Sequence, residues 1–149
     1  MALRKTGDRW NYMLPGTREK VAALETLAAH NGLLVMFWDG WRDPADTLKN
    51  IAAGTSKVTD AFGSLHTWGL AFDMVFIGPL GEPVWLPDTD PRWKQLAQLG
   101  ESIGLKSGGI MWGWDWPHFQ MPGFSYSALK YIYDTDYETF LSERGVMLT

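Results

Sequence analysis

The chain has 149 residues, of which 46% are hydrophobic and 20% charged, with a formal net charge of -4 and no cysteine. This composition is typical of a single globular domain, residues 1–149, and the acidic balance excludes the basic surface of a nucleic-acid-binding protein. Without cysteine there are no disulfides, thiolate nucleophiles or cysteine-ligated zinc, so any metal site must use His, Asp and Glu.

The first 16 residues carry two early positive charges but no apolar run behind them. We therefore expect no secretory signal peptide. No stretch of the sequence approaches the roughly 18 apolar residues that a membrane-spanning helix needs. These patterns predict a protein that is made in the cytoplasm and has no membrane partner.

A helix over residues 17–32 is the first predicted element, with Thr17 as its N-cap and Gly32 at its end. Its apolar face is formed by Val21, Leu24, Leu27 and Ala28. Residues 33–38 read as a short buried strand, and residues 44–53 as a short helix after a turn.

A second strand is predicted over residues 70–77, where the sequence is apolar on both faces apart from Asp73. The turn sequence "GPLGEP" follows, so residues 84–86 are expected to form the hairpin partner of this strand.

The C-terminal half begins with a helix over residues 90–104, which Asp90 caps and Pro91 opens. One face of this helix carries the apolar residues Trp93, Leu96, Ala97 and Ile103. Residues 117–121 read as a further strand, and the tail from Ser125 is predicted to be helical. Helices and strands are mixed without a repeating βαβ order, which favours the α+β class.

Nine tryptophans are the unusual feature of the composition. We expect them to build the core and the walls of a cleft, because large aromatic side chains dominate burial in small domains. A surface of exposed rings that stack on sugars is the alternative.

Asp73 is the residue that the strand pattern does not explain, because its neighbours on the same face are Ala71 and Val75. An ionised carboxylate in apolar surroundings costs several kcal/mol unless it is paired or bound to a metal. The nearest cationic residues in the sequence are Lys57 and Arg92. Asp73 therefore indicates either an arginine partner distant in the sequence or a metal ion such as zinc.

Two histidines complete a possible zinc site with Asp73. His66 lies in the loop that enters the strand, where a tight turn at Gly69 would bring it near Asp73, and His118 follows Pro117. Two imidazoles and one carboxylate leave a fourth tetrahedral position for water, as in catalytic zinc sites. Zinc lowers the pKa of that water to about 7.

Asp115 precedes His118 by three residues, an offset from which its carboxylate can take the proton of the attacking water and pass it to the leaving amine. The alternative is a turn aspartate that caps local backbone amides. His30, the remaining histidine, is expected only to interact with the dipole at the end of the first helix.

The quoted residues resemble a known family. "SLHTWGLAFD" is similar to the Ser-x-His-x-x-Gly-x-Ala-x-Asp signature of the zinc D-Ala-D-Ala carboxypeptidase/VanY-type peptidases, peptidase M15. "DWPHF" resembles the second signature of this family, in the form found in bacteriophage L-alanyl-D-glutamate endopeptidases. "DGWR", which ends at Arg42, is similar to a Ser-Gly-Tyr-Arg segment, and "VTDAFGSLH" matches the approach to the first signature. The resemblance runs from about Leu33 to Gln120.

The resemblance implies zinc bound by His66, Asp73 and His118, with Asp115 as general base. It also implies that Arg42 stabilises the oxyanion of the tetrahedral intermediate or holds a substrate carboxylate. A plain salt bridge from Arg42 to a nearby aspartate is the alternative. Ser64 is expected to form a hydrogen bond near the site.

Two departures from the family pattern concern the substrate side of the site. Asp39 and Trp41 stand where the family usually has Ser and Tyr. The stretch "GGIMWGWDWPHF" is also shorter than in typical endolysins, so Asp115 could correspond to a turn aspartate instead of the base.

For the fold, the resemblance implies a small antiparallel sheet with helices packed on it, as in hedgehog-like and D-Ala-D-Ala peptidase domains. For the function it implies a zinc metallopeptidase that cleaves the peptidoglycan stem peptide, most simply a monomeric phage endolysin that cuts L-Ala-D-Glu during host lysis. Such an antimicrobial enzyme would reach the periplasm through a holin lesion and lacks a separate cell-wall-binding domain. The alternatives are a D-Ala-D-Ala carboxypeptidase or dipeptidase, and a non-catalytic zinc-stabilised wall-binding module.

Overall fold

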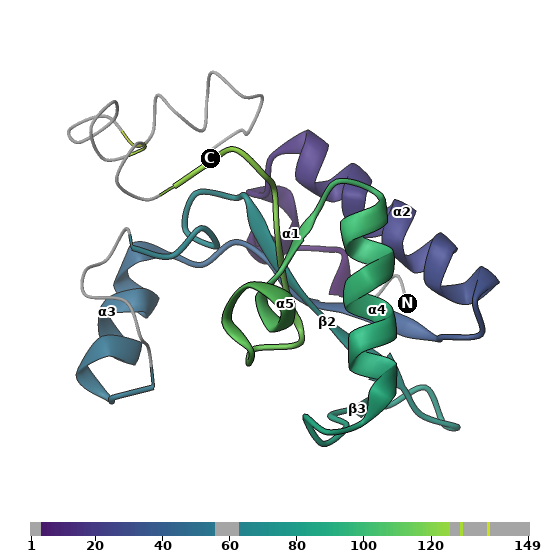
Figure 1. The fold of residues 1–149 in the computed structure, drawn as a ribbon. Helices are drawn as coiled ribbons and strands as arrows, with labels where there is room; N and C mark the ends of the chain where they lie inside the picture. Colours follow the sequence, from purple (N-terminus) through teal and green to yellow (C-terminus); the bar gives the residue numbers. More distant parts are fainter. Residues whose placement is uncertain (1–3, 56–62, 126–128, 130–136, 138–149) are drawn as a thin grey trace.

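The computed structural model describes residues 4–55, 63–125, 129 and 137, and the fold is given for these residues (Figure 1). Its helices are α1 (Asp8–Asn11), α2 (Pro15–His30), α3 (Pro44–Ala52), α4 (Pro91–Ser102) and α5 (Gly108–Trp112). Its strands are β1 (Val35–Asp39), β2 (Ala71–Ile77), β3 (Pro83–Val84), β4 (Lys106–Ser107) and β5 (His118–Gln120).

The strands form one antiparallel sheet in the order β1-β2-β5-β4, with β3 paired to β2 as a hairpin. This confirms the predicted α+β class with a small antiparallel sheet. The predicted strands near 33–38, 70–77, 84–86 and 117–121 are all present, and only their ends differ.

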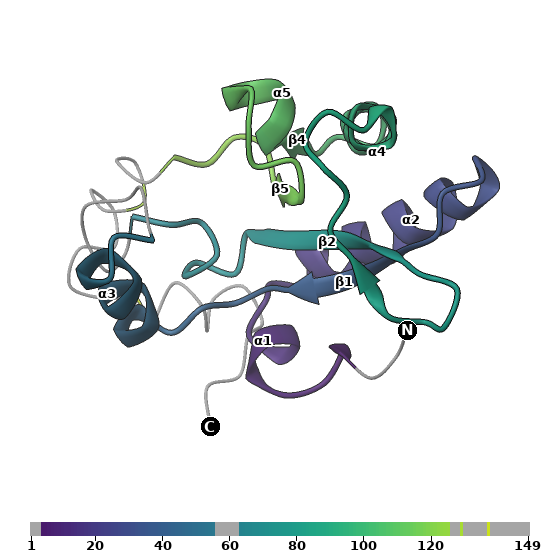
Figure 2. The same ribbon diagram turned by 90° about the horizontal axis from the view of Figure 1, so that it is seen from below.

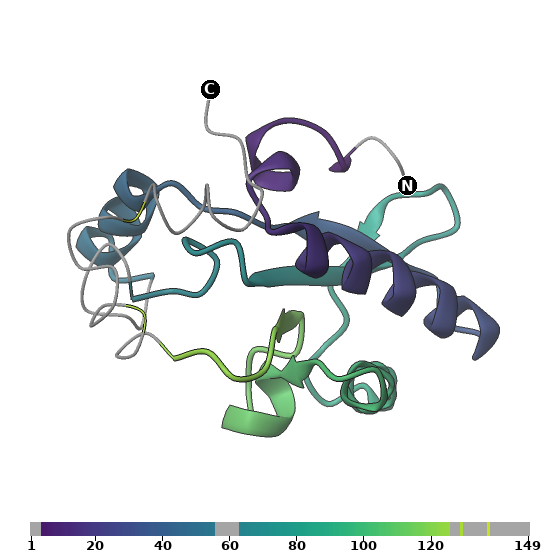
Figure 3. The same ribbon diagram turned by 90° about the horizontal axis from the view of Figure 1, so that it is seen from above.

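Helix α2 lies against β1 and β2, and α4 lies beside α2 and packs on β4 (Figures 1 and 3). The side chains of β2 that face these helices form the main core with them. The core residues from these elements include Val21, Leu24, Phe37, Phe72, Phe76, Trp93, Leu96 and Phe119. Because side chains alternate along a strand, Asp73 points to the opposite face of the sheet from Phe72 and Met74.

Helix α2 begins at Pro15, so the prediction that Thr17 caps it is wrong. Proline suits the first helical position because its fixed φ matches the helix and it has no N–H that needs a partner. Thr17 instead lies inside the helix, fully buried, and its hydroxyl donates a hydrogen bond to the Gly69 carbonyl over 2.9 Å. The other predicted cap is confirmed, because the Asp90 carboxylate accepts from the Arg92 N–H at the start of α4.

Three short elements were not predicted: α1, β4 and α5. Each has five residues or fewer, which is too short for a periodic pattern to stand out. The predicted helical tail lies outside the described residues, apart from two isolated positions. No helix within the described part of the chain combines the length and the apolar character that crossing a bilayer requires.

The tryptophans divide between the core and the surface. Trp41, Trp68 and Trp93 are buried, as expected for core residues. Trp112 and Trp114 are about half exposed and line a cavity, which agrees with the expectation of cleft walls. Trp85 is exposed on the β3 hairpin, away from that cavity.

Candidate metal centre

Asp73 and His118 are brought together by strand register. In the antiparallel pairing of β2 with β5, Asp73 lies directly opposite His118. Directly opposed residues of neighbouring strands have Cβ atoms about 5 Å apart and share a face of the sheet. The backbone of the next residue continues the pairing, since the Met74 N–H donates to the Pro117 carbonyl over 2.9 Å.

His66 reaches the same place from the turn that precedes β2. Its backbone N–H donates to the Ser64 hydroxyl over 3.2 Å, and its carbonyl accepts from the Gly69 N–H over 3.1 Å. Gly69 has φ +68°, and a Cβ there would lie 2.7 Å from the Tyr12 carbonyl oxygen. The turn therefore requires glycine, and the Thr17 hydroxyl holds the Gly69 carbonyl from the other side.

Three ligand atoms converge at this point. His66 Nε2 lies 3.5 Å from Asp73 Oδ1, and His118 Nδ1 lies 3.8 Å from the same oxygen. The two imidazole nitrogens are 3.2 Å apart. Donor atoms bound to one tetrahedral zinc at about 2.0–2.2 Å are separated by about 3.4 Å. The spacing of this cluster therefore fits a zinc ion without rearrangement of the backbone.

The outer nitrogens of both imidazoles are already engaged. His66 Nδ1 lies 2.8 Å from the Gly40 carbonyl oxygen, and His118 Nε2 lies 2.8 Å from Gln120 Oε1. Each acceptor fixes the ring proton on the outer nitrogen, so the inner nitrogen of a neutral ring carries a lone pair. Two lone pairs and a carboxylate then face one another, an arrangement that requires a cation between them.

The pKa values of the cluster also indicate that a positive charge is favoured next to Asp73. Burial opposes the charged forms of both Asp73 and His66, but their mutual attraction and hydrogen bond prevail: the pKa of Asp73 is lowered and the pKa of His66 is raised. Burial, together with the charge on His66, lowers the pKa of His118 to about 4. Without a metal, a proton on His66 is thus the favoured cation.

Asp115 lies in the turn between α5 and β5, and its Oδ2 is 3.9 Å from His118 Nδ1. Its φ of +58° is the single positive value among the non-glycine residues of the described chain. Such a backbone is uncommon for non-glycine residues, and Asp is one of the types that adopt it most readily. Burial, followed by the charge on Asp73, raises the pKa of Asp115 to about 6.

The alternative role of Asp115 is to cap backbone amides of the turn with its carboxylate. Among the described residues, no backbone N–H donates to this carboxylate. The close approach of the turn to α5 depends on glycine, since a Cβ on Gly108 would lie 2.6 Å from the Asp115 carbonyl oxygen. The "GG" of the shortened segment therefore opens α5 and supports the turn that presents Asp115.

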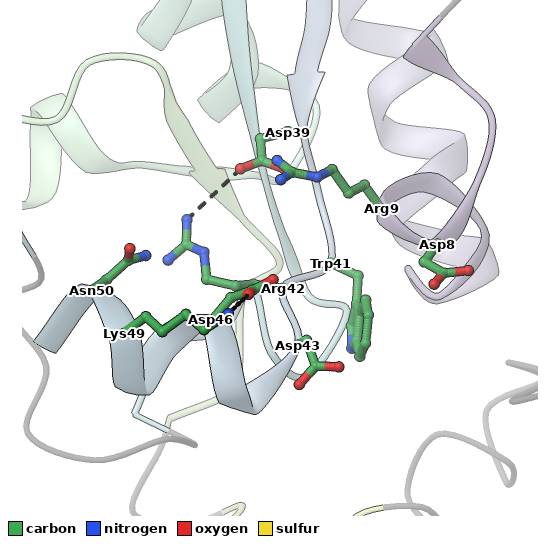
Figure 4. Close-up of a pocket in the computed structure, with 9 residues that line it drawn as sticks. All are labelled: Asp8, Arg9, Asp39, Trp41, Arg42, Asp43, Asp46, Lys49 and Asn50. Atoms are coloured by element: carbon green, nitrogen blue, oxygen red, sulfur yellow. Dashed lines mark hydrogen bonds and ion pairs between the residues drawn. The ribbon is translucent and has the colours of Figure 1, made fainter. Parts of the chain in front are cut away.

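Arg42 lies in the segment between β1 and α3 (Figure 4), and it lines the same cavity as the metal cluster. Its Nη2 is 3.9 Å from Asp39 Oδ2, while Asp39 Oδ1 accepts from Arg9 Nη1 over 2.8 Å. The salt bridge that is the alternative role of Arg42 is therefore present only as a long contact with Asp39, and Asp39 pairs more closely with Arg9. Arg42 also borders the cavity over the metal cluster, which leaves its guanidinium available there.

A cavity of about 700 Å³ covers the cluster. The three predicted ligands line this cavity. Other lining residues include Arg42, Asn50, Trp112, Trp114 and Asp115. Arg42 and Asn50 also line a second, charged cavity, shown in Figure 4. The predicted site residues therefore share one open pocket, whereas His30 is exposed at the end of α2 and does not line it.

Two partners of the imidazoles were missed from the sequence. Gln120 follows His118 by two residues in a strand, a spacing that places both side chains on one face and was a usable signal. Gly40 acts through its backbone carbonyl, for which the sequence carries no signal. The two tryptophans of the cavity wall, Trp112 and Trp114, were likewise not assigned individually.

Comparison with known proteins supports the resemblance inferred from the signatures. Residues 57–121, which contain the three predicted ligands and Asp115, match the sequence model of a peptidase M15 family described as D-alanyl-D-alanine carboxypeptidase. A search of curated protein sequences gives no match.

Two solved structures share the fold. The L-Ala D-Glu endopeptidase ChiX of Serratia marcescens is 24% identical, with a TM-score of 0.53 over 74% of this chain and 83% of its own. A mutant of the vancomycin resistance D,D-pentapeptidase VanY, from a VanB-type cassette and in complex with Zn(II), is 14% identical. It has a TM-score of 0.51 over 87% of this chain and 83% of its own.

The fold, the family match and the cluster of two histidines and one aspartate together define a metallopeptidase whose metal is zinc. Residues 57–121 thus match the M15 family model, in agreement with the resemblance that the signatures predicted, and the fold is shared with two peptidases.

Proposed function

We propose that this protein is a zinc-dependent peptidase that cleaves the peptidoglycan stem peptide, at the bond between L-Ala and D-Glu. The observation that carries the proposal is the cluster of His66 Nε2, Asp73 Oδ1 and His118 Nδ1, which has three donors among the described residues and opens to a cavity that contains Asp115. Three protein ligands and one open position are typical of catalytic zinc.

The roles of the individual residues follow from their positions. His66, Asp73 and His118 would hold the zinc, which when bound polarises the scissile carbonyl and lowers the pKa of water. Asp115, with a pKa raised to about 6, accepts the proton of the attacking water and returns it to the leaving amine. Arg42 supplies a permanent positive charge for the developing oxyanion or for a substrate carboxylate.

Two features favour the endopeptidase over the carboxypeptidase. The "DWPHF" segment has the form found in phage L-alanyl-D-glutamate endopeptidases. The fold is also shared with an L-Ala D-Glu endopeptidase, ChiX, although VanY shares it to a similar extent. We further propose that the protein acts as a monomer on the wall in the periplasm, as a phage endolysin during host lysis.

Digestion of purified muropeptides, with products identified by mass, tests this proposal. We expect release of the stem peptide from D-Glu onward, with L-Ala left on the sugar. Loss of terminal D-Ala alone, with the L-Ala-D-Glu bond intact, would instead support the carboxypeptidase alternative.

The substitution Asp115→Asn separates an enzyme from a non-catalytic zinc-stabilised module. We expect the variant to keep its zinc and its melting temperature while turnover falls by about 10²–10⁴-fold, the range for loss of a general base. Zinc content by atomic absorption and turnover on the same muropeptides are the two measurements. If the unchanged protein shows no turnover either, the module alternative gains.

A further inference from the structure

The wall of the metal cavity contains two tryptophans that are unusually exposed. Trp112 and Trp114 expose 47% and 46% of their surface, and their ring centroids are 6.1 Å apart with planes tilted by 34°. We call them the tryptophan pair. Exposed aromatic rings that are clustered and border a pocket mark a binding surface, whereas single exposed rings need no explanation.

The tryptophan pair is held firmly beside the metal ligands. The Trp112 ring lies 5.1 Å from the His118 ring. Gly113 ends α5 in the left-handed conformation, with φ +77°, and this turn sets Trp114 next to Trp112. The turn is packed against α5 by Trp116, whose ring occupies the space that a Cβ on Gly109 would need. A subsite on the pair would therefore be preorganised, which lowers the cost of binding.

The cavity has walls of different chemistry. Arg42 and Asn50 contribute a cationic and polar wall from the region of α3, and the end of α5 with the turn that follows it contributes the tryptophan pair. Helices α3 and α5 lie apart in each of the three views (Figures 1, 2 and 3). A ligand that spans the metal cluster would complement these walls with an anionic group on the side of Arg42 and an uncharged, partly apolar group on the side of the tryptophan pair.

We propose that the tryptophan pair is a subsite for a pyranose ring, the sugar to which the stem peptide is attached. This inference rests on the proposed function, in which the bond that is cut lies one residue from that sugar. One face of a pyranose presents C–H groups, and the negative face of an indole attracts them. The acidic D-Glu side of the substrate then lies toward Arg42, and the sugar side toward α5.

The chain offers a matched control for this proposal. Trp85 exposes 53% of its surface and packs edge-on against Trp38, with ring centroids 5.5 Å apart. It follows β3 and does not line the metal cavity. Replacing Trp85 removes as much exposed aromatic surface as replacing Trp114, without touching the site.

The test is a binding measurement by titration calorimetry on the zinc-loaded protein in the Asp115→Asn background, where turnover is suppressed. Two ligands are compared: a disaccharide-linked stem tetrapeptide and the same tetrapeptide without sugar. We expect the sugar-bearing ligand to bind at least about tenfold more tightly, the effect of one good aromatic contact. Addition of Trp114→Ala should abolish this preference, Trp114→Phe should restore part of it, and Trp85→Ala should leave it intact.

Two results would overturn the subsite. One is equal affinity for both ligands without any tryptophan substitution, and the other is an equal loss for both ligands in Trp114→Ala, which would mean that the ring contacts the peptide. Failure of the proposed function is distinguishable, because the protein with Asp115 intact would then leave the L-Ala-D-Glu bond intact in both ligands.

Discussion

At the scale of single residues, the site depends on which nitrogen of each imidazole is free. The Gly40 carbonyl and the Gln120 amide oxygen hold the outer nitrogens of His66 and His118, so that the inner nitrogens face Asp73. Groups of this kind orient metal ligands and increase their basicity. These two groups are partners of the imidazoles instead of metal ligands, and they affect how tightly the cluster binds a metal.

The Gln120 contact gives a first prediction. The substitution Gln120→Leu should weaken zinc affinity by about 10–100-fold, because His118 loses the acceptor that fixes its ring. Zinc affinity is measured by competition with a chelator. The matched control is Gln98→Leu, at an exposed position of α4, for which we expect unchanged affinity. Equal affinities in the two variants would show that Gln120 does not orient the ring.

The charges of the two imidazoles give a second prediction, for the zinc-free protein. The pKa of His66 is raised above 6.5, so its stabilising effect is present below pH 6.5 and lost as the pH rises through its folded value. The pKa of His118 is lowered to about 4, so stability is also lost as the pH falls from 6.5 toward 4. The raised pKa of Asp115 offsets the loss from His118 below pH 6, so the clear expectation is a free energy of unfolding that falls as the pH rises above 6.5.

Urea unfolding of the chelator-treated protein at a series of pH values measures this dependence. In the variant His66→Ala the decline above pH 6.5 should disappear. A stability that rises between pH 6.5 and 8.5 in the unsubstituted, zinc-free protein would contradict the assignment of a bound proton to His66.

At the scale of elements, the site is assembled by two devices: strand register and a tight turn. Register between β2 and β5 sets Asp73 opposite His118, and register between β1 and β2 sets Asp39 opposite Asp73. Like charges directly opposite one another are destabilising. Here Arg9 and Arg42 face Asp39, while the imidazoles and the metal position face Asp73, so each carboxylate has its own cations.

The contact between α2 and the His66 turn gives a third prediction. The substitution Thr17→Val should destabilise the fold by about 0.5–1.5 kcal/mol, because the Gly69 carbonyl loses one of its two donors and keeps only the Leu14 N–H. Chemical denaturation measures the effect. Thr26→Val, at an exposed position of the same helix, is the control and should change the free energy of unfolding by less than about 0.5 kcal/mol. A similar small effect at Thr17 would contradict the role of this hydrogen bond.

Most elements could be predicted from the sequence because their signals are local. The α4 helix carries its own cap and apolar face, and the β2 strand carries an uninterrupted apolar pattern around Asp73. The start of α2 could not be predicted from Thr17, because its hydroxyl is used by a tertiary contact 52 positions away instead of by the helix end. The α5 helix is too short for a pattern, and its packing depends on contacts of Gly108 and Gly109 with the following turn.

At the scale of the whole molecule, the metal centre joins segments that are distant in the sequence. The end of β1 supplies the Gly40 carbonyl, the turn before β2 supplies His66, and β5 supplies His118 with Gln120. The residue types and their spacing were sufficient to predict that His66, Asp73 and His118 come together, whereas the partners that orient the two imidazoles depend on the folded backbone. Because the complete ligand set exists only in the folded chain, metal binding and folding are linked.

A crystal structure of the zinc-loaded protein, with the metal located by its anomalous scattering, tests the central claim most directly. We expect one zinc ion at about 2.0–2.2 Å from His66 Nε2, Asp73 Oδ1 and His118 Nδ1. Its fourth position should face the cavity on the side of Asp115. A zinc ion bound elsewhere, or a fourth protein donor that closes this position, would contradict the assignment of a catalytic metal centre.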